Sequence, residues 1–183
     1  EVKVFLIGDS HLSSLSFDLK ERLKDSFTFI PITDAVYFHF EQHVLFNKQT
    51  KSIVNNYNEL NRNINKLLEK SEDNIIIFGG VTSYYFYQKR FVNNNSYNSH
   101  QYVSRSNSQT EISELKRDFK NLIEKLSKKN KIILLYPIPE IGINLNRYLI
   151  NNFYGEWQFD YNDYLSVNNE IINFFDEIDL KNL

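Results

Sequence analysis

The sequence predicts a single α/β domain over residues 1–183, in which helices cover both faces of a parallel sheet in a three-layer α/β/α sandwich. Segments rich in β-branched and apolar residues alternate with segments whose apolar residues recur at helical spacing. The predicted strands are almost continuously apolar, which is typical of strands buried on both faces. A length of 183 residues, of which 42% are hydrophobic, suits one compact core.

The first part of the chain predicts a strand, a helix, a second strand and a second helix. Residues 2–8 are apolar, and leucines then recur at helical spacing over 12–23. The segment 27–33 is a second strand candidate, and Pro31 favours an edge position because proline cannot donate a ladder hydrogen bond. An amphipathic helix follows from Ser52, with an apolar stripe that ends at Leu68.

The middle of the chain is less regular. Residues 34–50 do not favour one structure, whereas 74–81 read as a buried strand that stops at two glycines. A polar and aromatic loop is expected over 84–107, and it is long enough to be a candidate for function. Its tyrosines and amides could form a glycan-facing lid. The alternative is that Tyr84–Phe86 pack under the strand and the rest is a surface loop.

The last part of the chain completes the alternation. Ser108 and Glu111 have capping-box spacing, and a helix is expected over 112–126. Residues 131–140 predict another buried strand that prolines end, and a final helix is expected over 164–178.

Composition excludes several classes of function. Lys and Arg number 21 against 23 Asp and Glu, and they are interspersed, so nothing favours nucleic acid as a partner. The absence of cysteine excludes disulfides, thiolate nucleophiles and cysteine metal sites. No apolar run has the length that a bilayer span requires, and the first residues do not resemble a signal peptide.

Three strand ends carry unusual chemistry: GDSH at 8–11, FGGVTS at 78–83 and YPIPE at 136–140. Carboxyl ends of parallel strands share one edge of the sheet, where ligands bind. Ser10 at this edge is either a nucleophile on a strand-to-helix turn or a serine that caps the following helix. A nucleophilic serine needs a base and oxyanion donors, and backbone N–H groups near Ser10, Gly79 or Gly80 are candidate donors.

The segments LIGDSHLSSL and LLYPIPEIG resemble the SGNH (GDSL-type) hydrolases, and among them the SGNH domains fused to type-3 membrane acyltransferases. The resemblance covers nearly the whole chain and implies a flavodoxin-like sheet. It implies that Ser10 is the nucleophile of an O-acyltransferase or esterase and that its own N–H is one oxyanion donor. The implied partners are an acyl donor, a carbohydrate acceptor of the cell surface and a fused membrane domain. The implied location is outside the cytoplasmic membrane, and no metal or organic cofactor is implied.

The sequence departs from that family's pattern in three places. No glycine lies between Gly8 and Gly79, where the family has an oxyanion glycine. The family's Gly-x-Asn is replaced by FGGVTS, in which Thr82 or a backbone N–H could substitute. No histidine has an aspartate three positions before it, so the catalytic His and Asp are not found. We expect the chain to be a fragment that ends before its last strand; the alternative is a non-catalytic glycan-binding or interaction module that has lost its base.

The four histidines offer few other sites. His11 adjoins Ser10, but adjacent side chains point apart, so it is not expected to be the base. His39 and His43, with Glu41 between them, could ligate zinc, or they could be polar residues on a partly exposed segment. The second interpretation is preferred. His100 is expected in the loop and exposed.

Overall fold

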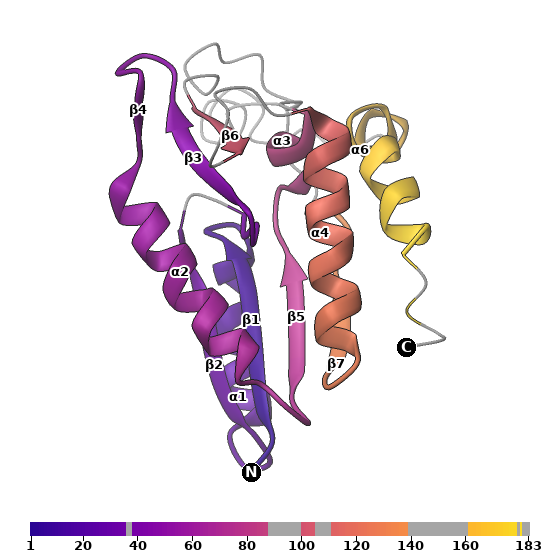
Figure 1. The fold of residues 1–183 in the computed structure, drawn as a ribbon. Coiled ribbons are helices and arrows are strands. Elements are labelled where there is room, and N and C mark those ends of the chain that lie inside the picture. The colour runs from indigo at the N-terminus through magenta and orange to yellow at the C-terminus, as the bar shows by residue number, and fades with distance from the viewer. Residues whose placement is uncertain (36–37, 88–99, 105–110, 139–160, 179, 181–183) are drawn as a thin grey trace, which may run out of the picture.

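The computed structural model describes residues 1–35, 38–87, 100–104, 111–138, 161–178 and 180, and at its centre is a four-stranded parallel sheet (Figure 1). The strand order is β2-β1-β5-β7. The strands are β1 (Lys3–Asp9), β2 (Thr28–Ala35), β5 (Ile75–Gly79) and β7 (Lys131–Leu134). The chain adds β2 on one side of β1 and β5 on the other, so the order reverses at β1 as in flavodoxin-like sheets. The predicted edge position of the strand that contains Pro31 is confirmed.

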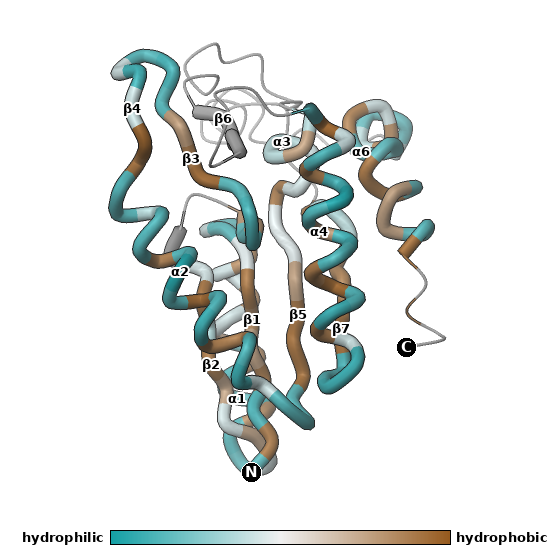
Figure 2. Tube along the Cα trace, in the orientation of Figure 1, coloured by the Kyte–Doolittle hydropathy of each residue, from teal (hydrophilic) through white to brown (hydrophobic). Residues whose placement is uncertain are grey.

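Helices cover both faces of this sheet, which confirms the predicted fold class. The 3-10 helix η1 (Leu12–Leu15) and α1 (Ser16–Leu23) cover one face, while α2 (Asn55–Glu69) and α4 (Ile112–Ser127) cover the other. Helices α3 (Thr82–Tyr87) and α6 (Tyr161–Asp176) add to the core on the α2 and α4 side. Apolar residues of the strands therefore face helices on both sides (Figure 2).

Alternation along β1 explains how one strand serves two cores. Val4 and Leu6 pack with α1, whereas Phe5 and Ile7 pack on the opposite face, because successive side chains point to opposite sides of a sheet. All four are at most 2% exposed. The larger core is aromatic, and its centre is Phe119 of α4, which is fully buried. Its ring contacts those of six other described phenylalanines: Phe38, Phe40, Phe78, Phe86, Phe174 and Phe175.

A second, antiparallel sheet of three short strands was not predicted. Its order is β4-β3-β6, with β3 (His43–Asn47), β4 (Ser52–Ile53) and β6 (His100–Ser104). This sheet includes part of the segment 34–50, for which the sequence favoured no one structure, and part of the predicted loop 84–107. That loop prediction is wrong where α3 and β6 form; the remaining positions, 88–99 and 105–107, lie outside the described residues. Pairing of β6 with β3 spans more than fifty positions, so local patterns do not reveal it.

Several predicted boundaries shift. The helix expected from Ser52 begins at Asn55, and β7 ends at Leu134 instead of continuing to 140. Beyond β7 the chain still bonds to its neighbour, because Leu135 N–H donates to the Phe78 carbonyl at 2.8 Å. Helix α4 begins as expected, but Glu111 makes no side-chain cap bond to it, and Ser108 lies outside the described residues.

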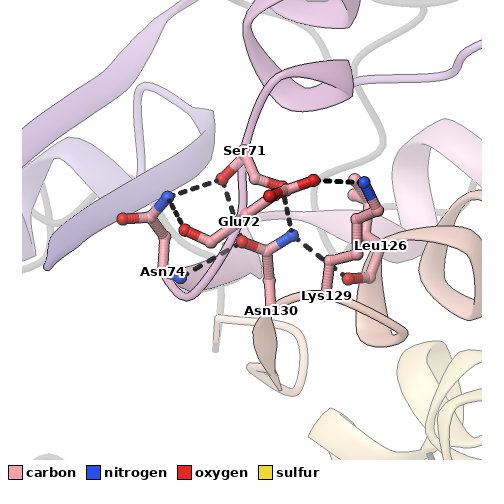
Figure 3. A network of polar contacts seen from close by, with 6 residues as sticks. All are labelled: Ser71, Glu72, Asn74, Leu126, Lys129 and Asn130. Atoms are coloured by element: carbon pink, nitrogen blue, oxygen red, sulfur yellow. Dashed lines mark hydrogen bonds and ion pairs between the residues drawn. The ribbon is translucent and has the colours of Figure 1, made fainter.

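A polar network closes the amino-terminal edge of the sheet (Figure 3). The buried Asn130 side chain accepts hydrogen bonds from the Ser71 hydroxyl at 3.0 Å and the Asn74 N–H at 3.2 Å. Its amide donates to the carbonyls of Ser71 at 3.0 Å and Leu126 at 3.2 Å. The network thus joins the end of α2, the start of β5 and the turn between α4 and β7.

Candidate functional site

Strand β1 delivers Ser10 to the carboxyl edge of the parallel sheet. Six buried residues lead up to it, and Ser10 itself is exposed. Its carbonyl accepts a hydrogen bond from the Ser13 hydroxyl at 2.6 Å, which closes the turn into η1. Within the described part of the chain, the Ser10 hydroxyl makes no hydrogen bond, so the interpretation of Ser10 as a helix cap is wrong.

The capping role belongs to Asp9, which is fully buried. One carboxylate oxygen accepts the N–H groups of His11 at 2.9 Å and Leu12 at 3.3 Å. The other oxygen accepts the N–H of Val81 at 2.7 Å. Asp9 therefore ties the turn that carries Ser10 to the segment that follows β5.

The hydrogen bonds keep the Asp9 carboxyl ionised. Burial alone would raise its pKa, but the hydrogen bonds from His11 and Val81 and the charge of the nearby imidazole together lower the pKa below its usual value. Sequence analysis did not single out Asp9. The available signal was an aspartate at a strand end, directly before a turn with unpaired N–H groups.

The glycines at this edge are required by close packing. A Cβ on Gly8 would lie 2.1 Å from the Gly79 carbonyl oxygen. Gly80 has a φ of 129°, and its Cβ would lie 2.6 Å from the Asp9 carboxylate. Gly80 thus makes room for Asp9, whereas a Cβ on Gly79 would lie 3.0 Å from Leu135 and 3.2 Å from Leu12. The role of both glycines as oxyanion donors stays a prediction.

Thr82, the fourth candidate donor, begins α3 and is fully buried. Its hydroxyl oxygen has no hydrogen-bond partner among the described residues. The neighbouring Ser83, by contrast, donates to Asn168 of α6 at 2.5 Å. A buried hydroxyl without a partner lowers the stability of the fold, so the position of Thr82 calls for another explanation than stability.

His11 lies beside the carboxylate of Asp9. Its Nδ1 is 3.6 Å from an Asp9 oxygen, and its side chain is 44% exposed. That His11 does not act as the base stays a prediction.

The expectation that His39 and His43 lie on a partly exposed segment is wrong, because both are buried. The Nδ1 of His43 is 2.6 Å from a carboxylate oxygen of Asp118 in α4, a pair that the sequence did not reveal. Burial lowers the pKa of His39 to about 4. Glu41 pairs with Lys125 at 2.6 Å instead of joining the histidines.

The positions of His39, Glu41 and His43 do not support the alternative that they ligate zinc. Among the described residues, no group of three or more His, Asp or Glu side chains could hold a metal ion. His100 starts β6 opposite Asn47, so its backbone belongs to a strand and not to the expected loop.

The predicted glycan lid is only partly within the described residues. Tyr85 and Phe86 are 8% and 2% exposed and belong to the aromatic core, as the alternative interpretation expected. The part of the lid at 88–99 and the segment 139–160 lie outside the described residues.

Ser10 therefore lies at the end of β1, the strand at which the order of the parallel sheet reverses. The turn that carries its hydroxyl is fixed by the buried carboxylate of Asp9. A serine in this position can attack an acyl carbon once a base removes its proton. No described histidine forms a hydrogen bond with it. The described helices also include none that is both long and apolar enough to cross a bilayer.

A family model described as "SGNH domain (fused to AT3 domains)" matches residues 1–183. No curated protein and no solved structure matches the chain. The family's link to acyltransferase-3 domains supports a fused membrane acyltransferase and fits a membrane-associated protein. The chain therefore belongs to the SGNH domains of the type fused to acyltransferase-3 domains, a family with hydrolase and acyltransferase activity.

Proposed function

We propose that the domain is a serine-dependent O-acyltransferase or esterase that acts on acyl groups, acetyl groups first of all, of a cell-surface polysaccharide. The observation that supports it most is the exposed Ser10 at the end of β1, on a turn fixed by the buried Asp9. The domain works outside the cytoplasmic membrane, next to a fused membrane acyltransferase.

In the proposed reaction, the Ser10 oxygen attacks the carbonyl carbon of an acyl donor while a base takes the hydroxyl proton. The tetrahedral intermediate collapses, the donor's leaving group departs with a proton, and the acyl group stays on Ser10. A sugar hydroxyl, or water in an esterase, then attacks the acyl-enzyme and releases the serine. Candidate donors to the oxyanion are the N–H groups of Ser10, Gly79 and Gly80 and the hydroxyl of Thr82.

The base is a histidine that an aspartate orients. The resemblance puts this pair in an Asp-x-x-His segment after the last helix, and we propose that such a segment serves Ser10. Among the described residues, His43 of β3 and Asp118 of α4 form a buried pair, but neither side chain is hydrogen-bonded to Ser10.

A second candidate function is a glycan-binding or interaction module without catalysis. One observation favours it: none of the described histidines is hydrogen-bonded to Ser10.

Labelling by a serine-reactive probe separates the two. The full-length protein is treated with a fluorophosphonate, and the adduct is mapped by mass spectrometry. Labelling is expected at Ser10, absent in Ser10→Ala, and retained in Ser14→Ala, an exposed serine of η1 that serves as control. Labelling that persists in Ser10→Ala would overturn the assignment of the nucleophile, and an unlabelled Ser10 favours the binding module.

A further inference from the structure

We propose that a pocket between α2 and the small antiparallel sheet β4-β3-β6 binds a neutral sugar unit of the acceptor, an inference that rests on the proposed function. The pocket has a volume of about 390 Å³, which is in the range of small-molecule sites. Val44 of β3 and Ile53 of β4 supply the apolar part of its lining.

The polar part of the lining comes from the first half of α2. Residues three or four positions apart share one face of a helix, so these side chains gather at the pocket. Two of them carry opposite charges and are exposed, and neither forms an ion pair among the described residues. The polar lining residues are Asn55, Asn58, Glu59, Asn61 and Arg62.

Two amide oxygens of this lining are buried without a hydrogen-bond partner among the described residues, those of Asn58 and Asn61. Asn61 is 2% exposed, and its amide nitrogen donates to the carbonyls of Phe40 at 2.6 Å and His43 at 3.4 Å, which fixes the orientation of the side chain. An unpaired buried oxygen lowers the stability of a fold. Two of them at one pocket therefore indicate a ligand that donates hydrogen bonds.

The pocket is formed before any ligand binds. Phe46 of β3 pairs with Ile53 of β4, and the N–H of Val54, directly before α2, donates to the Leu45 carbonyl at 2.9 Å. The strands and the start of the helix are thus joined by backbone hydrogen bonds. A pocket that is already ordered loses little freedom on binding, so its contacts with a ligand are retained as affinity.

The chemistry of the lining suits a neutral sugar. Sugar hydroxyls both donate and accept hydrogen bonds, and the amides, the Glu59 carboxylate and the Arg62 guanidinium offer both kinds of partner. Since the two charges are opposite, a charged ligand would be attracted by one and repelled by the other. Ile53, which is 48% exposed, offers an apolar surface to the C–H groups of a sugar ring.

The pocket is close to the strand that carries Ser10. Asn61 lines a second, smaller cavity as well, and that cavity reaches Ile7 and Gly8 of β1, two residues before the nucleophile. In Figure 1, α2 begins at the end of the parallel sheet where β5 leads into α3. An acceptor chain with one unit in the pocket can thus extend along this edge toward Ser10.

The test measures binding of three neutral probes, cellotetraose, chitotetraose and mannotetraose, and of the anionic tetragalacturonate to the full-length protein by calorimetry. At least one neutral probe is expected to bind, with an affinity that falls about tenfold in Arg62→Ala because hydrogen bonds to the guanidinium are lost. Glu59→Gln keeps an acceptor oxygen and should bind a neutral probe within about twofold of wild type. Arg117→Ala, which removes an exposed arginine of α4 outside the pocket, is the matched control and should not change the affinity.

The subsite is refuted if no neutral probe binds, if tetragalacturonate binds more tightly than every neutral probe, or if Arg62→Ala binds as tightly as wild type. Fluorophosphonate labelling of the same variants distinguishes this failure from failure of the proposed function. Intact labelling of Ser10 without binding of a neutral sugar removes the subsite alone. Sugar binding that depends on Arg62, with Ser10 never labelled, removes the enzyme assignment and leaves the binding module.

Discussion

The two edges of the parallel sheet differ in how completely their polar side chains are hydrogen-bonded. At the amino-terminal edge, Asn130 uses all four of its hydrogen-bonding positions on neighbouring elements. At the carboxyl edge, the Thr82 hydroxyl is buried without a partner among the described residues, and Ser10 is exposed. The polar groups named at the first edge are hydrogen-bonded to neighbouring elements, whereas the hydroxyls of Ser10 and Thr82 at the second edge have no hydrogen bond among the described residues.

Asp9 differs from the other polar residues of the carboxyl edge because its carboxylate is fully hydrogen-bonded. A fully satisfied, ionised carboxylate holds three N–H groups and so fixes the turn on which Ser10 is exposed. Removing it should therefore affect both stability and reactivity, whereas changes at the amino-terminal edge should affect stability alone.

Asp9→Asn is expected to have the largest effect. The amide offers one acceptor oxygen and one NH₂ group, which would face an N–H donor, so the variant should lose about 3 kcal/mol of unfolding free energy. The rate of Ser10 labelling should also fall at least about tenfold, because the turn is no longer fixed. Urea unfolding and timed labelling measure the two effects. A variant with unchanged labelling would show that Asp9 does not position the serine.

The stability of the folded protein is expected to depend on pH because of His39. The folded protein holds His39 neutral with a pKa of about 4, whereas the unfolded chain takes up a proton near 6.5. Stability should therefore be complete above pH 6.5 and fall by about 3 kcal/mol as the pH drops toward 4. Unfolding by urea at several pH values measures this loss. His39→Phe should flatten the pH dependence between these limits, and an unaltered slope would contradict the explanation.

Asn130→Ala should affect stability without affecting chemistry. Loss of its four hydrogen bonds is expected to lower the free energy of unfolding by about 2 kcal/mol. Labelling of Ser10 at a temperature where the variant is folded should keep its wild-type rate. Slower labelling would mean that the two edges are coupled.

Thr82→Val should have the smallest effect on stability, and of opposite sign. Valine has a similar shape and lacks the unpaired hydroxyl, so the variant should be about 0.5–1 kcal/mol more stable. If the hydroxyl contributes to the oxyanion site, the rate of acyl transfer should fall at the same time. Thermal unfolding and ester hydrolysis are the two measurements, and Ser83→Ala, which breaks a satisfied bond to Asn168, is the contrasting variant. A destabilised Thr82→Val would show that the hydroxyl has a partner in solution.

Much of the fold was predictable because it depends on local periodicity. The apolar run that contains Val4, Phe5, Leu6 and Ile7 can be read from the sequence, and so can the apolar stripe that places Phe119 of α4 in the core. The edge position of β2 followed from the missing N–H of Pro31.

The small sheet and the buried polar pairs were not predictable in this way. β3 pairs with a strand more than fifty positions away, and His43 meets Asp118 only after α4 has packed beside it. Neither contact leaves a periodic signal. The buried state of His39 depends likewise on the surrounding helix and sheet, so the histidines looked exposed in the sequence.

The candidate site was predictable in part. Ser10 at a strand end followed from the GDSH segment, but the role of Asp9 required coordinates, because its third hydrogen bond comes from Val81, seventy-two positions later. The sequence suggested that Gly79 and Gly80 lie close to a substrate, whereas in the structure Gly80 lies against the Asp9 carboxylate and Gly79 against Leu135 and Leu12.

The central claim is that the hydroxyl of Ser10 accepts the acyl group. The most direct measurement incubates the full-length protein with p-nitrophenyl acetate, quenches it in acid and locates the acetyl group by peptide mass spectrometry. The account predicts one acetyl group on Ser10, absent in Ser10→Ala and present in Ser14→Ala. An acetyl group found on another residue, with Ser10 unmodified, would contradict it.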